Sequence, residues 1–283
     1  MLYFLSPLRG RGKNQPLAGP PRLTRHPLMT DDPKAPATAL LQQGLFHHRQ
    51  GQLDLAMQRY VDVLQGDPTN ADALYYVAVV ACEDGQYQQG VDLAKRAIEV
   101  GKPQARVHNL MGQAYDRLGQ KLEAIKAYDA ALALDPNFAA AHGNRASILA
   151  ETGFPEEALK AYDRALALNA NSGADWFNRG TLLHDMGRLQ DAIDSYGHAL
   201  ALTPDLPEAH IANAAALMGL GRFDDALADM DRAIKLNPGL AVAHHGRAAA
   251  LKGLGRDEES KASAARAAEL DKAIAEAKTA PSH

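Results

Sequence analysis

Apolar residues recur along this chain with the period of an amphipathic helix, and they do so in paired segments. Between residues 106 and 118, four large apolar side chains fall on one helix face: Leu110, Met111, Tyr115 and Leu118. The following segment, 121–134, again spaces its apolar residues at helical intervals: Leu122, Ile125, Tyr128 and Leu132. The pattern predicts two helices joined by a short turn.

The turn is predicted at Gly119, because glycine adopts at no steric cost the left-handed conformation that commonly ends a helix. Glycine occupies the same point of the pattern every 34 residues: Gly51, Gly85, Gly119, Gly153, Gly187, Gly221 and Gly255. The chain is therefore predicted to consist of seven copies of one helix–turn–helix unit.

Two further positions of the repeat predict how the helices pack. If the units begin at residues 37, 71, 105, 139, 173, 207 and 241, position eight is always Gly or Ala. Position 24 is bulky in five units: Tyr60, Tyr128, Tyr162, Tyr196 and Met230. Small residues allow two helices to approach closely, and the bulky residue fills the space beyond them. Since one hairpin cannot bury its apolar face alone, we expect the units to stack into a solenoid.

Polar and proline pairs mark the end of most units. Asp135-Pro136 is predicted to supply the N-cap side chain and the first-turn proline of the next helix. The same role is expected for three equivalent pairs: Asp67-Pro68, Thr203-Pro204 and Asn237-Pro238.

The combination of small-8, Gly-15, Ala-20, aromatic-24, Ala-27 and Pro-32 resembles the tetratricopeptide repeat. This resemblance implies an all-α fold, a right-handed α-solenoid of about seven 34-residue units over residues 37–274. It leaves a leader at 1–36 and a C-terminal tail at 275–283, which we expect to lengthen the last helix and then fray.

The leader differs from the rest in charge. Residues 1–30 contain five basic residues and no acid, whereas the whole chain carries −4, so the remainder carries −9. Three interpretations compete: a disordered arm, a basic patch for anionic partners, or upstream sequence before a true start at Met29. The third is favoured, because the residues after Met29 read as a short lead into the first helix.

Composition and motifs exclude several classes of function. No stretch approaches the ~18 apolar residues of a membrane span, and the acidic body lacks the Lys/Arg clusters that nucleic-acid binding requires. Phosphate-loop, nucleophile-elbow and zinc-protease motifs are absent, so we expect no enzyme activity, cofactor or metal. The single cysteine, Cys82, fits a reducing compartment, and the alanine-rich style favours a bacterial cytoplasmic protein.

Two series of polar residues follow the repeat. His108, His142, His210 and His244 share position four with Trp176, which indicates a packing site for a flat ring rather than a metal site. Arg145, Arg179 and Arg247 share position seven and are expected to form helix-to-helix ion pairs with acids such as Asp163 and Asp194.

The family resemblance implies a concave groove lined by the first helix of each unit. The candidate groove residues are Tyr75, Tyr76, Arg106, Asn109, Gln113, Asn144, Ser147, Phe177, Asn178, Thr181 and His184. An Asn side chain offers both a donor and an acceptor, so it can pair with a peptide backbone of any sequence. Asn144 and Asn178 resemble the start of the asparagine ladder in the repeat region of O-linked N-acetylglucosamine transferase. The alternative, that they are simply solvated, stays equally open.

These features predict a protein–protein interaction scaffold that binds an extended segment of an unidentified partner, with Tyr75, Tyr76 and Phe177 as anchors. Two alternatives remain: a substrate-recruiting subunit for a separate enzyme such as a glycosyltransferase, and a scaffold that self-associates through its alanine-rich C-terminal unit.

Overall fold

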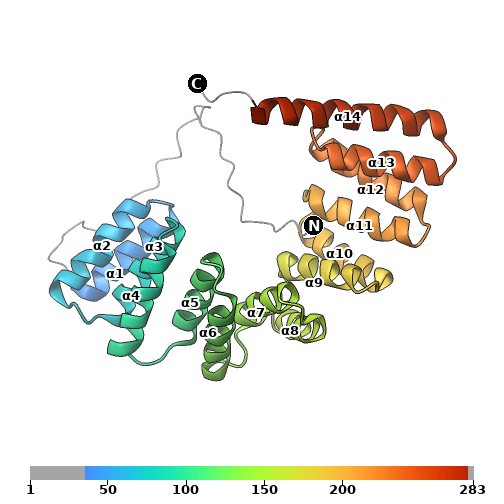
Figure 1. The fold of residues 1–283 in the computed structure, drawn as a ribbon. Coiled ribbons are helices and arrows are strands. Elements are labelled where there is room, and N and C mark those ends of the chain that lie inside the picture. Colours follow the sequence, from blue (N-terminus) through green and yellow to red (C-terminus); the bar gives the residue numbers. More distant parts are fainter. Residues whose placement is uncertain (1–35, 280–283) are drawn as a thin grey trace.

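Seven helix pairs follow one another along an arc in the computed structural model, which describes residues 36–279 (Figure 1). The first helices of the pairs are α1 (Ala37–Arg49), α3 (Ala71–Glu83), α5 (Ala105–Arg117), α7 (Ala139–Glu151), α9 (Gly173–Asp185), α11 (Pro207–Gly219) and α13 (Ala241–Gly253). The second helices are α2 (Leu53–Gly66), α4 (Tyr87–Val100), α6 (Lys121–Leu134), α8 (Pro155–Leu168), α10 (Leu189–Leu202), α12 (Phe223–Leu236) and α14 (Asp257–Thr279). The described part of the chain is all-α, as expected, and forms a solenoid of seven units.

Two expectations from the sequence concern the leader and the C-terminal tail. The leader predicted at 1–36, including the start proposed at Met29, lies outside the described residues apart from Pro36. At the other end, α14 continues through Thr279, and residues 280–283 lie outside the described range.

The recurring glycines form the turns inside the pairs, as predicted. All seven have positive φ, between 70° at Gly51 and 87° at Gly153. After Gly119, the backbone N–H of Gln120 donates to the Tyr115 carbonyl at 2.8 Å, which is the bond that closes a Schellman turn. A residue with a Cβ atom would lose about 1–2 kcal/mol of stability in this left-handed conformation, so glycine is the residue that fits.

The Asp-Pro pairs do not cap the following helices, and that prediction was wrong. Asp135 is the C-cap of α6, and α7 begins only after Phe138. The Asp135 carboxylate accepts the backbone N–H of Asn137 at 3.0 Å, so it stabilises the turn between units. Among the described helices, a first-turn proline occurs at Pro155 of α8 and Pro207 of α11, in other parts of the repeat.

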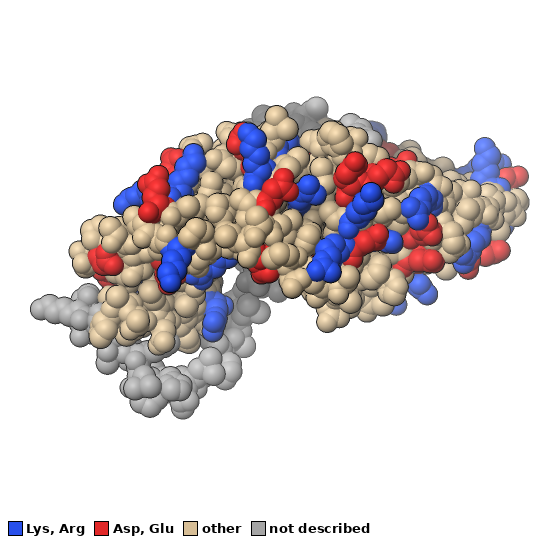
Figure 2. All heavy atoms as spheres, turned by 90° about the horizontal axis from the view of Figure 1, so that it is seen from below, with Lys and Arg blue, Asp and Glu red and all other residues tan. Residues whose placement is uncertain are grey.

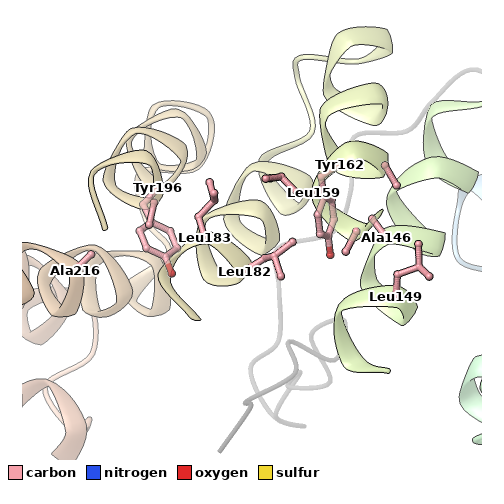
Figure 3. Packing of buried hydrophobic residues seen from close by; sticks show 11 residues of the cluster. Ala146, Leu149, Leu159, Tyr162, Leu182, Leu183, Tyr196 and Ala216 are labelled. Carbon is pink, nitrogen blue, oxygen red and sulfur yellow. The ribbon is translucent and has the colours of Figure 1, made fainter. Parts of the chain in front are cut away.

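The aromatic residue at position 24 packs on the bare backbone at position eight. A Cβ atom added to Gly180 would lie 2.7 Å from the Tyr196 ring, so the ring lies where a larger residue would stand. Tyr162 lies over Ala146 in the same way (Figure 3). Tyr128, Tyr162 and Tyr196 are each 2% exposed, which confirms that they belong to the core.

Burial also changes the acidity of these phenols. Desolvation raises the pKa of Tyr196 to about 12, although its hydrogen bond with the Thr181 hydroxyl opposes the shift. Burial likewise raises the pKa of Tyr60, Tyr128 and Tyr162 above the ordinary value. All four rings are therefore neutral packing groups near pH 7.

Hydrogen bonds from position four join the fourth to seventh units to the turns before them. The Trp176 Nε1–H donates to the Ala170 carbonyl at 2.9 Å, and the His142 Nε2 lies 3.0 Å from the Pro136 carbonyl. His210 and His244 repeat the contact with Pro204 and Pro238, each at 3.1 Å. Because a carbonyl only accepts, each ring must present an N–H. The position therefore requires a donor as well as a flat shape.

The predicted ion pairs between units form at position seven. Arg145 pairs with Asp129 at 2.6 Å, Arg179 with Asp163 at 2.8 Å, and Arg247 with Asp231 at 2.7 Å. In each pair the arginine belongs to a first helix and the aspartate to the second helix of the preceding unit. Asp194, the other acid considered, instead accepts from Gln190 on its own helix.

The first helices lie on the inside of the curve. Each first helix from α3 to α11 contacts the next first helix, whereas successive second helices make no comparable contacts in the described part of the chain. Elements on the inner side of a curved stack approach one another, and those on the outer side spread apart. We call the side of α3 to α13 that is turned into the curve the inner face.

Tyr162→Ala is expected to lower the free energy of unfolding by about 3–5 kcal/mol, because it removes a buried aromatic ring. Urea denaturation measures the change. Leu122→Ala is the matched control, since Leu122 is 74% exposed and its loss should cost less than about 0.5 kcal/mol. Equal effects of the two substitutions would contradict the packing.

The raised pKa of Tyr196 predicts a loss of stability in alkali. Its contribution is complete below the unfolded pKa of about 10 and disappears as the pH rises towards the folded value of about 12. Over this range the free energy of unfolding should fall by about 2–3 kcal/mol less in Tyr196→Phe than in the parent, since each pKa unit corresponds to 1.36 kcal/mol. Denaturation curves at successive pH values test this. An identical decline in the variant would refute the assignment.

Candidate functional site

The candidate groove residues lie on first helices that contact one another along the inner face. Most of them are half-buried, with Asn109 buried at 8% exposure and Gln113 exposed. Several bridge from one first helix to the next, so the inner face is a connected surface and not a row of independent side chains.

At α3 and α5, Arg106 holds two tyrosines together. Its guanidinium lies 4.5 Å from the Tyr75 ring centre and 5.5 Å from that of Tyr76, and donates to the Tyr76 hydroxyl at 3.2 Å. Arg106 also pairs with Asp72 on α3. Tyr76 also stacks on Tyr60, with 5.1 Å between the ring centres, and meets Tyr75 edge-on at 5.1 Å. The three predicted residues therefore form one cluster.

Between α5 and α7, two asparagines are hydrogen-bonded to each other. The Asn144 Nδ2 donates to the Asn109 Oδ1 at 3.1 Å. This bond uses one of the two N–H groups of Asn144, and none of residues 36–279 donates a hydrogen bond to its Oδ1. Because Asn109 is buried, Asn144 is held in a fixed orientation on the inner face.

Buried tyrosine hydroxyls order the polar residues of α7 and α9. The Tyr162 hydroxyl lies 2.8 Å from the Ser147 hydroxyl, and the nearby Asn178 side chain lowers the pKa of the same phenol. In the next unit, the Tyr196 hydroxyl donates to Thr181 at 3.4 Å. Ser147 and Thr181 are thus attached to the core through the position-24 rings.

Phe177 is the aromatic residue of α9 on this face. Its ring centre lies 5.8 Å from that of Tyr196, and the residue is half-buried. One side of the ring therefore rests on the core, while part of the side chain remains accessible.

Two of the candidate groove residues lie outside the connected clusters of the inner face. Gln113 is exposed on α5, and His184 is half-buried with its Nδ1 3.7 Å from the Asp185 carboxylate. Neither joins the clusters around Arg106, Asn144 or Tyr162.

The sequence interpretation missed the hydroxyls of Tyr162 and Tyr196 as members of the inner face. They were considered only as core rings, yet each has a hydroxyl residue at position nine of its own unit, Ser147 or Thr181. That pairing of Tyr-24 with Ser/Thr-9 was the available signal.

Asp175 adds a carboxylate that was also missed. Its side chain lies against the bare backbone of Gly143 on the preceding first helix. Burial raises the pKa of this carboxyl, and the Ser172 hydroxyl opposes the shift. An acidic group therefore stands beside the amides of the inner face.

The outward surface has a different character. Figure 2 shows Lys/Arg and Asp/Glu side chains interspersed over the side turned to the viewer, without a large area of one sign. The pairs at Arg145, Arg179 and Arg247 show how such charges neutralise one another.

The described residues contain neither a cluster that could hold a metal ion nor a thiolate at neutral pH. No group of three or more His, Cys, Asp or Glu residues between 36 and 279 is placed to hold a metal ion. Burial raises the pKa of the Cys82 thiol to about 11, so it is not a thiolate at neutral pH. Among the helices described, none is both long and apolar enough to cross a membrane.

Comparison with protein families gives three matching profiles, each described as tetratricopeptide repeat. They match residues 47–114, residues 137–204, and the two segments 105–138 and 207–240. Together the matches cover α2 and the five helix pairs from α3 to α12.

One curated relative matches a short stretch. Protein CTR9 homolog of Arabidopsis thaliana is 37% identical over 89 residues, which cover 31% of this chain and 8% of that protein. The chain thus corresponds to a small part of the relative.

Solved structures share the architecture. PilF of Pseudomonas aeruginosa aligns with a TM-score of 0.67 and 20% identity, over 73% of this chain and 94% of that one. MamA gives 0.57 and 23%, over 59% and 97%, and Cut9 from the APC/C hetero-tetramer Cut9-Hcn1 gives 0.67 and 18%, over 80% and 43%. At these identities the likeness concerns the fold alone.

Proposed function

The chain belongs to the tetratricopeptide-repeat family, and from that premise we propose that it is a non-catalytic scaffold that binds an extended segment of another protein along its inner face. The binding region in this proposal runs from α3 to α9. It comprises the Arg106 cluster, the Asn109–Asn144 pair, the Ser147–Tyr162–Asn178 contact and Phe177.

The observation that carries the proposal is the fixed amide of Asn144. Its bond to buried Asn109 orients the side chain, and among the described residues nothing else bonds to its second N–H or its carbonyl oxygen. Asn178, on the next first helix, is half-buried close to the Tyr162 hydroxyl. Two such amides can pair with a peptide backbone whatever its sequence, and the ordered one loses little side-chain entropy on binding.

Aromatic anchors would act at two points. Phe177 offers a half-buried ring next to the amides, and half-buried Tyr75 lies at the other end of the region. Tyr76 contributes by contacting both Tyr75 and Arg106. Aromatic side chains at such places commonly dominate binding energy.

Self-association through the last unit is less well supported. The exposed surface of α14 carries ion pairs within the helix, Lys261–Glu258 at 2.7 Å and Arg266–Glu269 at 2.8 Å. Such charges favour a solvated helix surface over an interface between copies. Recruitment for a separate enzyme would use the same inner face, so the identity of the captured partner distinguishes it from simple scaffolding.

The double substitution Asn144→Ala, Asn178→Ala is expected to reduce recovery of the partner about tenfold or more, because two hydrogen bonds at about 1 kcal/mol each are lost. Affinity purification of the tagged chain with quantitative mass spectrometry measures the recovery.

Two controls accompany this test. Asn109→Ala removes the partner of the internal hydrogen bond but keeps the Asn144 amide. Comparison with the double variant therefore separates the effect of losing the internal bond from the effect of losing the amide that binds the ligand. Glu157→Ala, Lys160→Ala changes exposed charges on α8 and should leave recovery unchanged. Full recovery with the asparagine double variant, in a normally melting protein, would refute the proposal.

A further inference from the structure

Asp175 differs from the other acids on the first helices α3, α5, α7 and α9, because it has no basic partner among the described residues. These four helices contain six acidic residues. Five of them pair with a basic side chain: Asp72 with Arg106, Glu83 with His48, Asp116 and Glu151 with Lys121, and Asp185 with His184. The sixth, Asp175, forms no ion pair with any basic residue between 36 and 279.

Asp175 also departs from the repeat. It holds position three of its unit, where the other six units have Ala or Val. Five of those residues are buried: Ala73, Val107, Ala141, Ala209 and Ala243. A carboxylate at such a place costs free energy, since burial removes water from a charged group. Accordingly, burial raises the pKa of the Asp175 carboxyl above its ordinary value.

The preceding unit provides the room for this carboxylate. Position five of α7 is Gly143, whereas the other first helices have a larger side chain there: Leu41, Tyr75, Asn109, Phe177, Ile211 and His245. A Cβ atom on Gly143 would overlap the Asp175 carboxylate. The carboxylate therefore occupies the place of a position-five side chain, the same position that holds the inner-face residues Tyr75, Asn109 and Phe177.

The residues around this carboxylate are polar but neutral. Asn144 follows Gly143 on α7, and Asn178 lies one helical turn after Asp175 on α9. The Ser172 hydroxyl accepts the backbone N–H of Asp175 at 3.3 Å and caps α9. Capping accounts for a polar residue at the start of the helix, but it supplies no positive charge. The charge that would complement Asp175 has to come from a ligand.

We propose that Asp175 is a subsite for a basic side chain, so that the segment bound along the inner face carries a lysine or arginine that pairs with this carboxylate. This inference rests on the proposed function, because the amides of Asn144 and Asn178 hold the backbone of the segment next to the charge. A single carboxylate suits a cationic side chain, whereas a metal ion requires several ligands. The inner face thereby selects a sequence and does not only accept a backbone.

The experiment compares two capped peptides, acetyl-Ser-Ala-Lys-Ala-Ser-amide and acetyl-Ser-Ala-Gln-Ala-Ser-amide, as ligands of the full chain. NMR titrations followed through the side-chain amides of Asn144 and Asn178 give a dissociation constant for each peptide. The lysine peptide is expected to bind about three- to tenfold more tightly, because a half-buried carboxylate attracts a cation more strongly than an exposed one. Asp175→Asn should abolish this preference and leave the binding of the glutamine peptide nearly unchanged.

Asp185→Asn is the matched control, since it removes the same charge from the same helix at a carboxylate that lies 3.7 Å from His184. It should keep the preference for lysine. Equal binding of the two peptides to the parent, or a preference that survives Asp175→Asn, would overturn this inference and leave the proposed function in place. Loss of the preference in Asp185→Asn as well would do the same. Absence of any shift of the two asparagine amides with either peptide would overturn both.

Discussion

The contact on which the rest of this structure depends is an aromatic ring lying on a bare helix backbone. In the fifth unit, Tyr196 rests against Gly180, and Tyr128 rests against Gly112 in the third. The ring sets how closely the two helices of a pair approach, and at 2% exposure it is among the largest buried side chains of the described residues. Position eight must therefore be small wherever position 24 is large.

The same ring connects the core to the inner face. The hydroxyls of Tyr162 and Tyr196 lie within hydrogen-bonding distance of Ser147 and Thr181. The packing residues are thus connected to side chains in the region proposed for recognition.

The helix pairs could be predicted from local sequence signals. The contacts between units could not, because they depend on how the helices meet in the folded chain. Gly119 had to end a helix because of its spacing and its freedom at positive φ. Asp135 was misassigned, because an Asp before a proline can close one helix as readily as it opens the next. Trp176 was expected only to pack, since its bond to the Ala170 carbonyl depends on how two units meet. The candidate groove residues lie on the first helices α3, α5, α7 and α9. Their binding role stays a prediction.

A double-mutant cycle between Gly180 and Tyr196 tests the ring-on-backbone contact most directly. Gly180→Ala should destabilise the parent by about 1–3 kcal/mol, because its methyl group overlaps the ring. In the Tyr196→Ala background, the same substitution should stabilise by about 1 kcal/mol, since alanine is the better helix former. A change of sign, measured by urea denaturation, is the predicted result. Equal effects in both backgrounds would show that the ring does not set the helix approach and would contradict the account.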